Sequence, residues 1–179
     1  MKIKILFLIL FLLSFSLGSV AQQKKLSDDK IELISAKLCT NIKYSRSNEF
    51  KINDFRSIIL RELSTIGSSK SQDKAVSDFL NRYSNKMVCV KNHLERNSRP
   101  LHLYKTAVLD GVLDLFDELM DDEVYQIDWN AYQIVNGKKE TLIDYLDKVL
   151  NGKFKNDSDL ELLRDDLINY GAKRGKDLK

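Results

Sequence analysis

Apolar residues recur at intervals of three and four residues along most of the chain after residue 27, which is the spacing of one buried helix face. The recurrence is clearest over residues 31–42, 55–66 and 75–94. Glycine and proline, which break helices, number only 7 and 1 among 179 residues. The sequence therefore predicts an all-α fold, and its composition excludes a collagen-like or broadly disordered chain.

An amino-terminal unit of three helices is expected over residues 22–97. Ser27, followed by Asp28 and Asp29, is a helix-start signal, because the serine side chain can accept a hydrogen bond from a free backbone amide. Gly67 is a stop signal for the second helix. The three helices are predicted at residues 27–40, 53–66 and 71–96.

A carboxyl-terminal unit of paired helices is expected over residues 98–179. Pro100 fits the first turn of a helix, and Gly111 interrupts the apolar pattern between two helices. Between residues 121 and 139 the pattern loosens, and Asn136-Gly137 marks a turn, so this segment is an extended loop or a short hairpin. The four helices are predicted at residues 101–109, 112–120, 141–150 and 158–170.

Residues 1–21 have the pattern of a secretory signal peptide. Two lysines precede an apolar run at residues 5–17, and Ser19 and Ala21 are small residues where a signal peptidase reads the chain. Cleavage is expected after Ala21, which makes the mature protein periplasmic or secreted. The alternative is a transmembrane anchor, but the run is shorter than the ~20 residues that span a bilayer. We therefore expect no stable membrane insertion after cleavage.

The charge of the mature chain is nearly balanced. Without Lys2 and Lys4, 27 basic residues face 26 acidic ones. A protein that binds nucleic acid concentrates positive charge on one face to displace counterions from phosphate. Only the tail that carries Lys173, Arg174, Lys176 and Lys179 does so here. A nucleic-acid partner is therefore not expected.

Cys39 and Cys89 are the two cysteines of the chain. In an oxidising compartment thiols tend to pair, and an even count leaves none over. The bridge would close a loop of about 50 residues, which the chain-entropy relation values at ~4 kcal/mol. It would join the first predicted helix to the third.

The alternatives to a disulfide are a metal site and a Cys-His nucleophile. Cys89 and His93 would share one face of a helix, with Cys39 and His102 as further metal ligands, but the closely spaced second pair of a structural zinc site is missing. A Cys-His nucleophile would need a reduced thiolate of low pKa in a cleft. A disulfide, with no metal and no cofactor, is the expected outcome.

The carboxyl-terminal unit carries a repeat-like pattern of small residues, a glycine and an apolar second helix. The first instance comprises Ala107, Val108, Gly111, Leu115, Phe116, Leu119 and Met120. Asp128, Asn130, Gly137, Thr141 and Leu142 follow as an outward loop, and Leu163, Leu167, Ile168, Gly171 and Ala172 end the second instance. These residues resemble a degenerate pair of ankyrin repeats over about residues 98–175. The resemblance implies stacked helical hairpins, capped by the amino-terminal three-helix unit because two repeats alone bury little surface.

The chain departs from the ankyrin pattern at two points. Pro100-Leu101-His102 is similar to the box that opens a repeat, but it lies about three residues too early for Gly111. The segments 121–139 and 151–157 are also longer than a repeat of about 33 residues allows. A generic helical-hairpin domain is the alternative.

Acidic residues gather in the first half of this unit, at Asp110, Asp114, Asp117, Glu118, Asp121, Asp122, Glu123 and Asp128. Such a run is usually a solvated face. In an ankyrin-like stack, however, loop tips bind partners, and aromatic residues beside charges are typical of protein interfaces. The candidate binding residues are Asp114, Asp117, Asp121, Asp122, Tyr125, Trp129 and Tyr132.

The sequence contains no nucleophile elbow, no phosphate-binding glycine loop, no HExxH and no calcium loop. We therefore expect a non-enzymatic exported module whose partner is another protein, such as a secreted toxin or an envelope enzyme. One such role is that of an immunity protein that neutralises a toxin in the bacterial cell envelope, with acids steering a basic cleft. The alternatives are an envelope hydrolase with paired carboxylates and a structural envelope protein.

Overall fold

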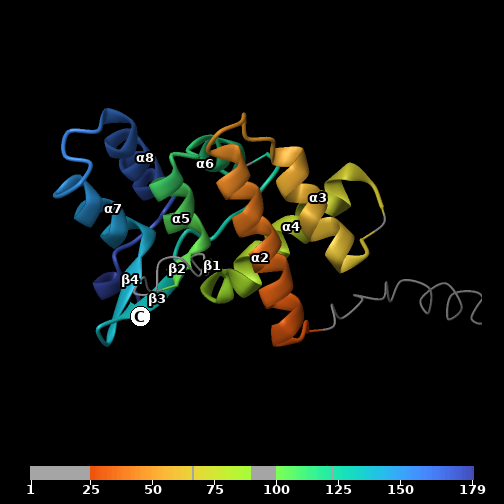
Figure 1. Ribbon diagram of the computed structural model, residues 1–179. Helices are drawn as coiled ribbons and strands as arrows, with labels where there is room; N and C mark the ends of the chain where they lie inside the picture. Colours follow the sequence, from red (N-terminus) through yellow and green to blue (C-terminus); the bar gives the residue numbers. More distant parts are fainter. Residues whose placement is uncertain (1–24, 66, 90–99, 122) are drawn as a thin grey trace, which may run out of the picture.

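The computed structural model describes residues 25–65, 67–89, 100–121 and 123–179, and these are mostly helical (Figure 1). The α-helices are α2 (Asp28–Ser45), α3 (Ile52–Leu63), α4 (Ser69–Tyr83), α5 (Leu103–Asp110), α6 (Asp114–Leu119), α7 (Leu142–Leu150) and α8 (Ser158–Asn169). Two short 3-10 helices are η1 (Ser84–Lys86) and η2 (Gly175–Asp177). The strands β1 (Val88–Cys89) and β2 (Leu101–His102) pair antiparallel, as do β3 (Tyr132–Val135) and β4 (Lys138–Thr141). The predicted helical class is confirmed, and two small sheets are added to it. The expected signal peptide and its cleavage site lie outside the described residues.

The predicted start of the first helix at Ser27 is confirmed, because Ser27 is the N-cap of α2. The Ser27 side chain accepts a hydrogen bond from the Lys30 amide, and α2 then buries Ile31, Ile34, Leu38 and Ile42 along one face. The helix runs to Ser45, five residues beyond the predicted end at residue 40. The next helix, α3, ends at Leu63 instead of residue 66, because Ser64 adopts a left-handed conformation (φ 53°).

The predicted helix over residues 71–96 is wrong over residues 84–89, the part after Tyr83 that the structure describes. α4 ends at Tyr83, a 3-10 turn follows, and Val88 pairs with His102 across a two-stranded sheet. Met87 and Cys89 are buried at alternate positions, which is the period of a strand, whereas Tyr83 and Met87 keep the four-residue spacing of a helix. Their backbone partners lie beyond residue 100, where local periodicity gives no information. Residues 90–99, which include His93, lie outside the described residues.

The helix predicted to begin at Pro100 begins later. Leu101 and His102 form β2, and α5 starts at Leu103 with His102 as its N-cap, whose side chain accepts from the Tyr104 amide. The predicted break at Gly111 is confirmed, because this glycine ends α5 in the left-handed region (φ 71°). The short hairpin with Asn136-Gly137 at its turn is also confirmed, and the Thr141 cap begins α7 as a capping box.

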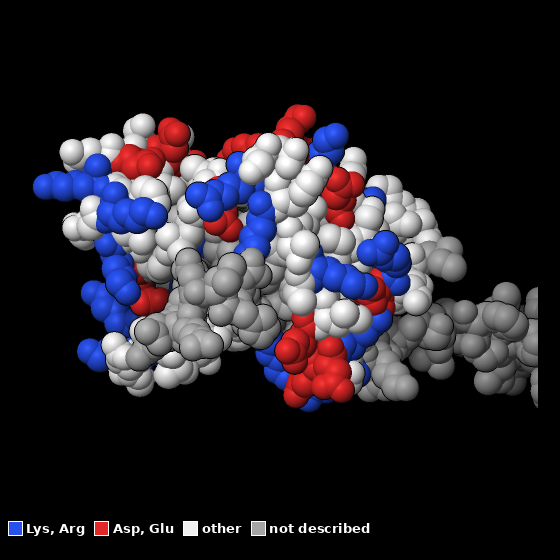
Figure 2. Space-filling view, in the orientation of Figure 1, with Lys and Arg blue, Asp and Glu red and all other residues white. Residues whose placement is uncertain are grey.

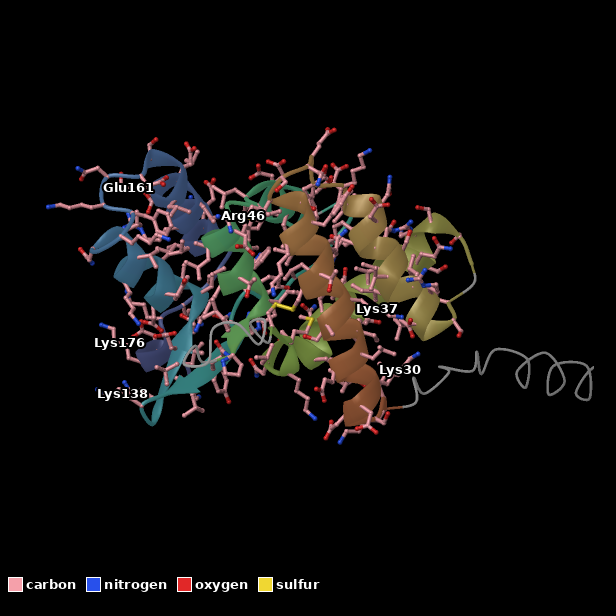
Figure 3. The ribbon with its side chains drawn as sticks, in the orientation of Figure 1. Lys30, Lys37, Arg46, Lys138, Glu161 and Lys176 are labelled. Carbon is pink, nitrogen blue, oxygen red and sulfur yellow. A yellow bond between two sulfur atoms is a disulfide. The ribbon has the colours of Figure 1, made fainter. Side chains whose placement is uncertain are left out.

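One hydrophobic core runs through the described chain, with buried side chains from all seven α-helices. In Figure 1, α2 runs through the middle of the view, with α3 on one side and α5 on the other. Glu62 of α3 pairs with both Lys30 and Lys37 of α2, which lowers the pKa of its carboxyl group to about 2 (Figure 3). Among the residues that the structure describes, no helix combines the length and apolar character needed to cross a membrane.

The two cysteines are joined, as the sequence predicts. Cys39 and Cys89 form a disulfide with their Cα atoms 5.5 Å apart, and both are buried. The bridge ties α2 to β1 and not to a third helix, because Cys89 lies on a strand. It therefore anchors α2 to the β1–β2 sheet that leads into α5.

Candidate functional site

An open groove lies between α4 and the segment that follows α6. It has a volume of about 650 Å³ and is lined by Ser69, Lys70, Asp73, Lys74, Ser77, Asp78, Asn81, Glu123, Val124 and Gln126. A second hollow of about 890 Å³ is lined by Asn81, Gln126, Ile127, Asp128, Asn169, Tyr170 and Gly171. The two hollows adjoin at Asn81 and Gln126, and together they reach from α4 to the end of α8. We call this pair of adjoining hollows the groove.

Side chains spaced four residues apart hold the wall of this groove in place. The Ser77 hydroxyl accepts from the Gln126 amide at 3.3 Å. The Asn81 side chain donates to the Gln126 carbonyl at 2.7 Å and accepts from the Asp128 amide at 2.7 Å. Asn85 accepts from the Tyr132 amide, also at 2.7 Å. Ser77, Asn81 and Asn85 lie on one face of the segment formed by α4 and η1. Their side chains fix residues 126–132 along that face, although only residue 132 belongs to a strand.

Asn130 fixes the far end of the groove. Its side-chain oxygen accepts from the Lys173 amide at 2.9 Å, and its nitrogen donates to the Asp128 carboxylate at 2.8 Å. The chain that leaves α8 is therefore tied to the same segment that α4 holds. Three regions that are distant in the sequence meet around the groove.

The groove presents charges of both signs. On α4, Lys74 pairs with Asp78 at 3.1 Å, and Asp73 pairs with Arg56 of α3 at 2.7 Å. Lys70 and Glu123 are exposed on the two sides of the groove. The lining residues include no histidine and no cysteine. The groove therefore offers hydrogen-bonding groups and charges of both signs.

The described acids that were predicted to bind a partner lie on α6 or just after it, and none of them lines the groove. This helix buries Leu115, Phe116 and Leu119 and exposes Asp114 and Asp117, and Asp121 is exposed just after it. Partial burial, followed by the charges of Asp114 and Asp166, raises the pKa of the Asp117 carboxyl. Figure 2 shows acidic side chains along the edge of the view above α6 and α8. Asp122 lies outside the described residues.

The expectation that Tyr125 and Trp129 are surface anchors is wrong. Tyr125 is 4% exposed and Trp129 is 3% exposed. The Trp129 ring lies 5.3 Å from the Tyr104 ring and 6.0 Å from the Phe116 ring, so it belongs to the core. Tyr132 is half-buried beneath the Lys139 ammonium group, 5.1 Å from its ring centre. Of the described candidate residues, Asp114, Asp117 and Asp121 are exposed, whereas Tyr125 and Trp129 are buried.

The sequence analysis did not identify the polar face of α4, which forms the wall of the groove opposite residues 123–126. Its signal is the recurrence of Ser77, Asn81 and Asn85 at four-residue intervals, beside a face that buries Ala75, Val76, Phe79 and Leu80. Small amides and hydroxyls favour backbone hydrogen bonds, so a stripe of them on a helix indicates a docked loop. The stripe does not identify which loop docks.

The histidine and cysteine side chains of the described residues are occupied in structural roles. The buried His102 ring donates from Nε2 to the Ser84 carbonyl at 2.7 Å and accepts at Nδ1 from the Tyr104 amide at 3.2 Å. Burial lowers the pKa of His102 to about 4, so the ring is neutral at pH 7. Within the described ranges, no three His, Cys, Asp or Glu side chains are placed to hold one metal ion.

The most buried charge does not line the groove either. The Lys105 side chain is 2% exposed, and its ammonium group lies 2.7 Å from the Glu140 carboxylate and 3.0 Å from the Glu140 carbonyl. Burial lowers the pKa of Lys105, and the bond to Glu140 opposes that shift. This pair joins α5 to β4 and supports the hairpin.

The groove and the exposed acids of α6 are thus the surfaces most suited to recognition in the part of the chain described here. The groove has a fixed wall and exposed charges of both signs, and the surface of α6 is acidic. No protein-family model, no curated protein and no solved structure matches this chain.

Proposed function

We propose that this chain is an exported, non-enzymatic module that binds another protein in the groove between α4 and residues 123–128. The observation that carries the proposal is the groove itself, which is open, extends over two adjoining hollows and is walled by a segment that Asn81 holds at two backbone positions. A wall fixed before binding loses little conformational entropy when a partner docks.

The lining suits a polypeptide segment. Hydroxyl, amide and charged side chains alternate along the groove, with Val124 and Tyr170 adding apolar surface at 40% and 43% exposure. Protein interfaces combine apolar contacts with about one hydrogen bond per 100–200 Å² of buried area. A stretch of a partner chain can satisfy both requirements here.

The acids on α6 favour a basic partner. Asp114, Asp117 and Asp121 are exposed, and the groove itself carries Glu123 in its lining. An acidic surface accelerates the encounter with a positively charged protein and selects against an acidic one. An exported toxin or envelope enzyme with a basic cleft has the matching charge, and the role proposed for this chain is to occupy and neutralise such a cleft, as an immunity protein does.

Two further features support an exported protein with an ankyrin-like carboxyl half. The Cys39–Cys89 bridge is a bond that persists in oxidising compartments. The α5–α6 and α7–α8 pairs are separated by the β3–β4 hairpin, which is the order of elements that the ankyrin resemblance implies. In this proposal the amino-terminal helices cap the stack through the shared core.

One observation favours a second candidate, a hydrolase with paired carboxylates. The pKa of Asp117 is raised beside Asp114 and Asp166, which is the kind of shift that a general acid requires. Asp114 and Asp117 are both exposed and neither lines the groove. Replacing Asp117 with asparagine would abolish hydrolysis of an envelope polymer if this candidate were correct, and it would leave the fold unchanged.

The binding proposal is tested with the chain from Gln22 to Lys179, which contains every described core residue, from Ile31 to Ala172. Tagged protein is used to capture partners from envelope extract and culture supernatant. Affinity for a captured partner is then compared between this chain and the variant Lys70→Glu with Glu123→Lys, which reverses two groove charges without changing the net charge.

The matched control is Lys155→Glu with Glu161→Lys, which exchanges the same charges at two exposed positions that do not line the groove. The groove variant should weaken binding at least about tenfold, and the control should bind as the unchanged chain does. A partner held equally by both variants would place the interface elsewhere. Retention of no protein at low salt would overturn the binding proposal.

A further inference from the structure

The tip of the β3–β4 hairpin exposes an aliphatic side chain among lysines. Ile134 is 64% exposed, although it lies in a strand whose neighbours are half-buried. Its cross-strand partner is Lys139, so the two side chains share one face of the hairpin. The Lys139 ammonium group lies over the ring of Tyr132, two residues before Ile134 on the same face.

The carboxyl-terminal tail brings more lysines to this tip. The Gly175 amide donates to the Asp144 carboxylate at 2.7 Å, which holds η2 against the start of α7. The Lys139 ammonium group donates to the Lys179 carbonyl at 2.9 Å, which holds the tail along β4. Tail and hairpin therefore meet around the hairpin tip, in a surface that we call the hairpin patch. It comprises Tyr132, Ile134 and Lys139 on one face of the hairpin, Lys138 on the other face beside the turn, and Lys176 and Lys179 of the tail.

The patch is basic, and the acids near it are few. Glu140 is committed to the buried Lys105, and Asp177 is the exposed acid within the tail. Figure 3 shows Lys138 and Lys176 at the same end of the carboxyl-terminal half, with Glu161 at the opposite end. Figure 2 shows lysine and arginine side chains around that end, and others near the opposite end beside acidic ones. The end that carries the hairpin tip is therefore basic, whereas the opposite end mixes both signs.

We propose that the hairpin patch docks the protein on an anionic lipid surface, with Ile134 in the interfacial region and the lysines at the headgroups. An exposed aliphatic side chain gains from contact with acyl chains, and lysines around it gain from negative headgroups while their stems cover apolar surface. A soluble polyanion would form favourable interactions with the lysines alone and would leave Ile134 exposed to water. The combination of the two residue types on one pinned surface selects the lipid.

This docking is peripheral and does not involve the groove, since none of the patch residues lines it. It would hold an exported protein at the membrane surface after its leader is removed. The proposal and the binding function therefore stand or fall separately.

The test is flotation of the chain from Gln22 to Lys179 with vesicles of phosphatidylcholine containing about 30 mol% phosphatidylglycerol, beside vesicles of phosphatidylcholine alone. The chain lacks the apolar leader, so any binding comes from the folded protein. We expect binding to the anionic vesicles only, and loss of most of it in about 1 M salt, where charges are screened. Equal binding to both vesicles, or to neither, would overturn the proposal.

Variants separate the two contributions. Lys138→Glu with Lys176→Glu should lower the partition coefficient at least about 25-fold, because each lysine near the surface contributes about fivefold. Ile134→Asn, which changes no charge, should lower it about tenfold through the lost apolar contact. The control Lys25→Glu with Lys51→Glu makes the same net change at exposed positions in the amino-terminal unit that do not line the groove. A loss as large in this control would show a net-charge effect and contradict a defined patch, and full binding by Ile134→Asn would contradict an apolar contact.

Discussion

Gly175 packs so tightly against the backbone of Lys139 that a Cβ atom on Gly175 would stand 2.0 Å from the Lys139 carbonyl oxygen. The approach lets the Gly175 amide donate to the Asp144 carboxylate at 2.7 Å. That carboxylate also accepts from the Thr141 amide and hydroxyl at the start of α7. One carboxylate thus caps a helix and holds the carboxyl-terminal tail against β4, and only glycine fits at the contact.

Replacing Gly175 with alanine should destabilise the protein by about 1–3 kcal/mol, because the methyl group forces the tail away from β4. The measurement is the free energy of unfolding from urea titrations followed by circular dichroism. The control is Gly152→Ala, where the nearest neighbour of a new Cβ atom would be the Lys148 carbonyl oxygen at 3.4 Å. A change of more than about 0.5 kcal/mol is not expected there. Equal stability of Gly175→Ala and the unchanged chain would contradict the tight contact.

The buried pair of Lys105 and Glu140 leads to an asymmetric prediction. Glu140→Gln leaves the ammonium group buried with a weaker partner, and should cost about 2–3 kcal/mol. Lys105→Met replaces the charge with an apolar chain of similar length, and should stay within about 1 kcal/mol of the unchanged protein. Both free energies come from the same urea titrations. The opposite order would show that the pair stabilises the fold through its charge and not merely that breaking it is costly.

Several elements were predictable because their causes are local. The caps at Ser27 and Thr141, the break at Gly111 and the Asn136-Gly137 turn each depend on residues within four positions. The pairing of Val88 with His102 was not predictable, because it joins segments fourteen residues apart. Met87 also keeps the four-residue spacing from Tyr83, so the apolar pattern of the preceding helix gives no sign that the helix has ended.

The candidate site was predicted in part for the same reason. The amphipathic pattern of α6 indicated that Asp114 and Asp117 face solvent, and they do. The alternation of Tyr125, Ile127 and Trp129 indicated an extended segment but not which side is buried. That choice follows from Tyr104 and Phe116, whose rings receive Trp129 and which come from other helices.

The buried His102 should make stability depend on pH. Its pKa is about 4 in the folded protein and 6.5 in the unfolded chain, so between these values the unfolded chain binds a proton that the folded protein does not. Stability from this group is therefore fully present above about pH 6.5 and is lost as pH falls towards about 4. The loss is about 3 kcal/mol and stops growing below pH 4, where both states are protonated.

The measurement is the free energy of unfolding at several values between about pH 7.5 and pH 4 for the unchanged chain and for His102→Asn. Asparagine retains a side chain that can cap α5 and does not titrate. Other groups contribute equally to both proteins, so the difference between the two curves isolates His102. Parallel curves over this range would contradict a neutral, buried imidazole.

Asn81 offers the most direct test of how the groove wall is held. Its side chain bonds the backbone at Gln126 and Asp128, so Asn81→Ala should cost about 1–2 kcal/mol in the free energy of unfolding. The loss should also be local. The Asp128 amide, which loses its acceptor, should exchange its hydrogen faster in NMR measurements, because its protection depends on that bond.

Two comparisons make this result specific to the wall. The Tyr132 amide is held by Asn85, so its exchange should change little in Asn81→Ala and should speed up in Asn85→Ala. Asn48→Ala removes an exposed asparagine that bonds only the nearby Tyr44 carbonyl, and it should leave both amides as they were. If Asp128 exchanges at the same rate with and without the Asn81 side chain, then the wall is held by its buried aromatics Tyr125 and Trp129 and not by the polar stripe of α4. In that case, groove affinity for a partner would depend on core packing, and Asn81→Ala would bind as the unchanged chain does.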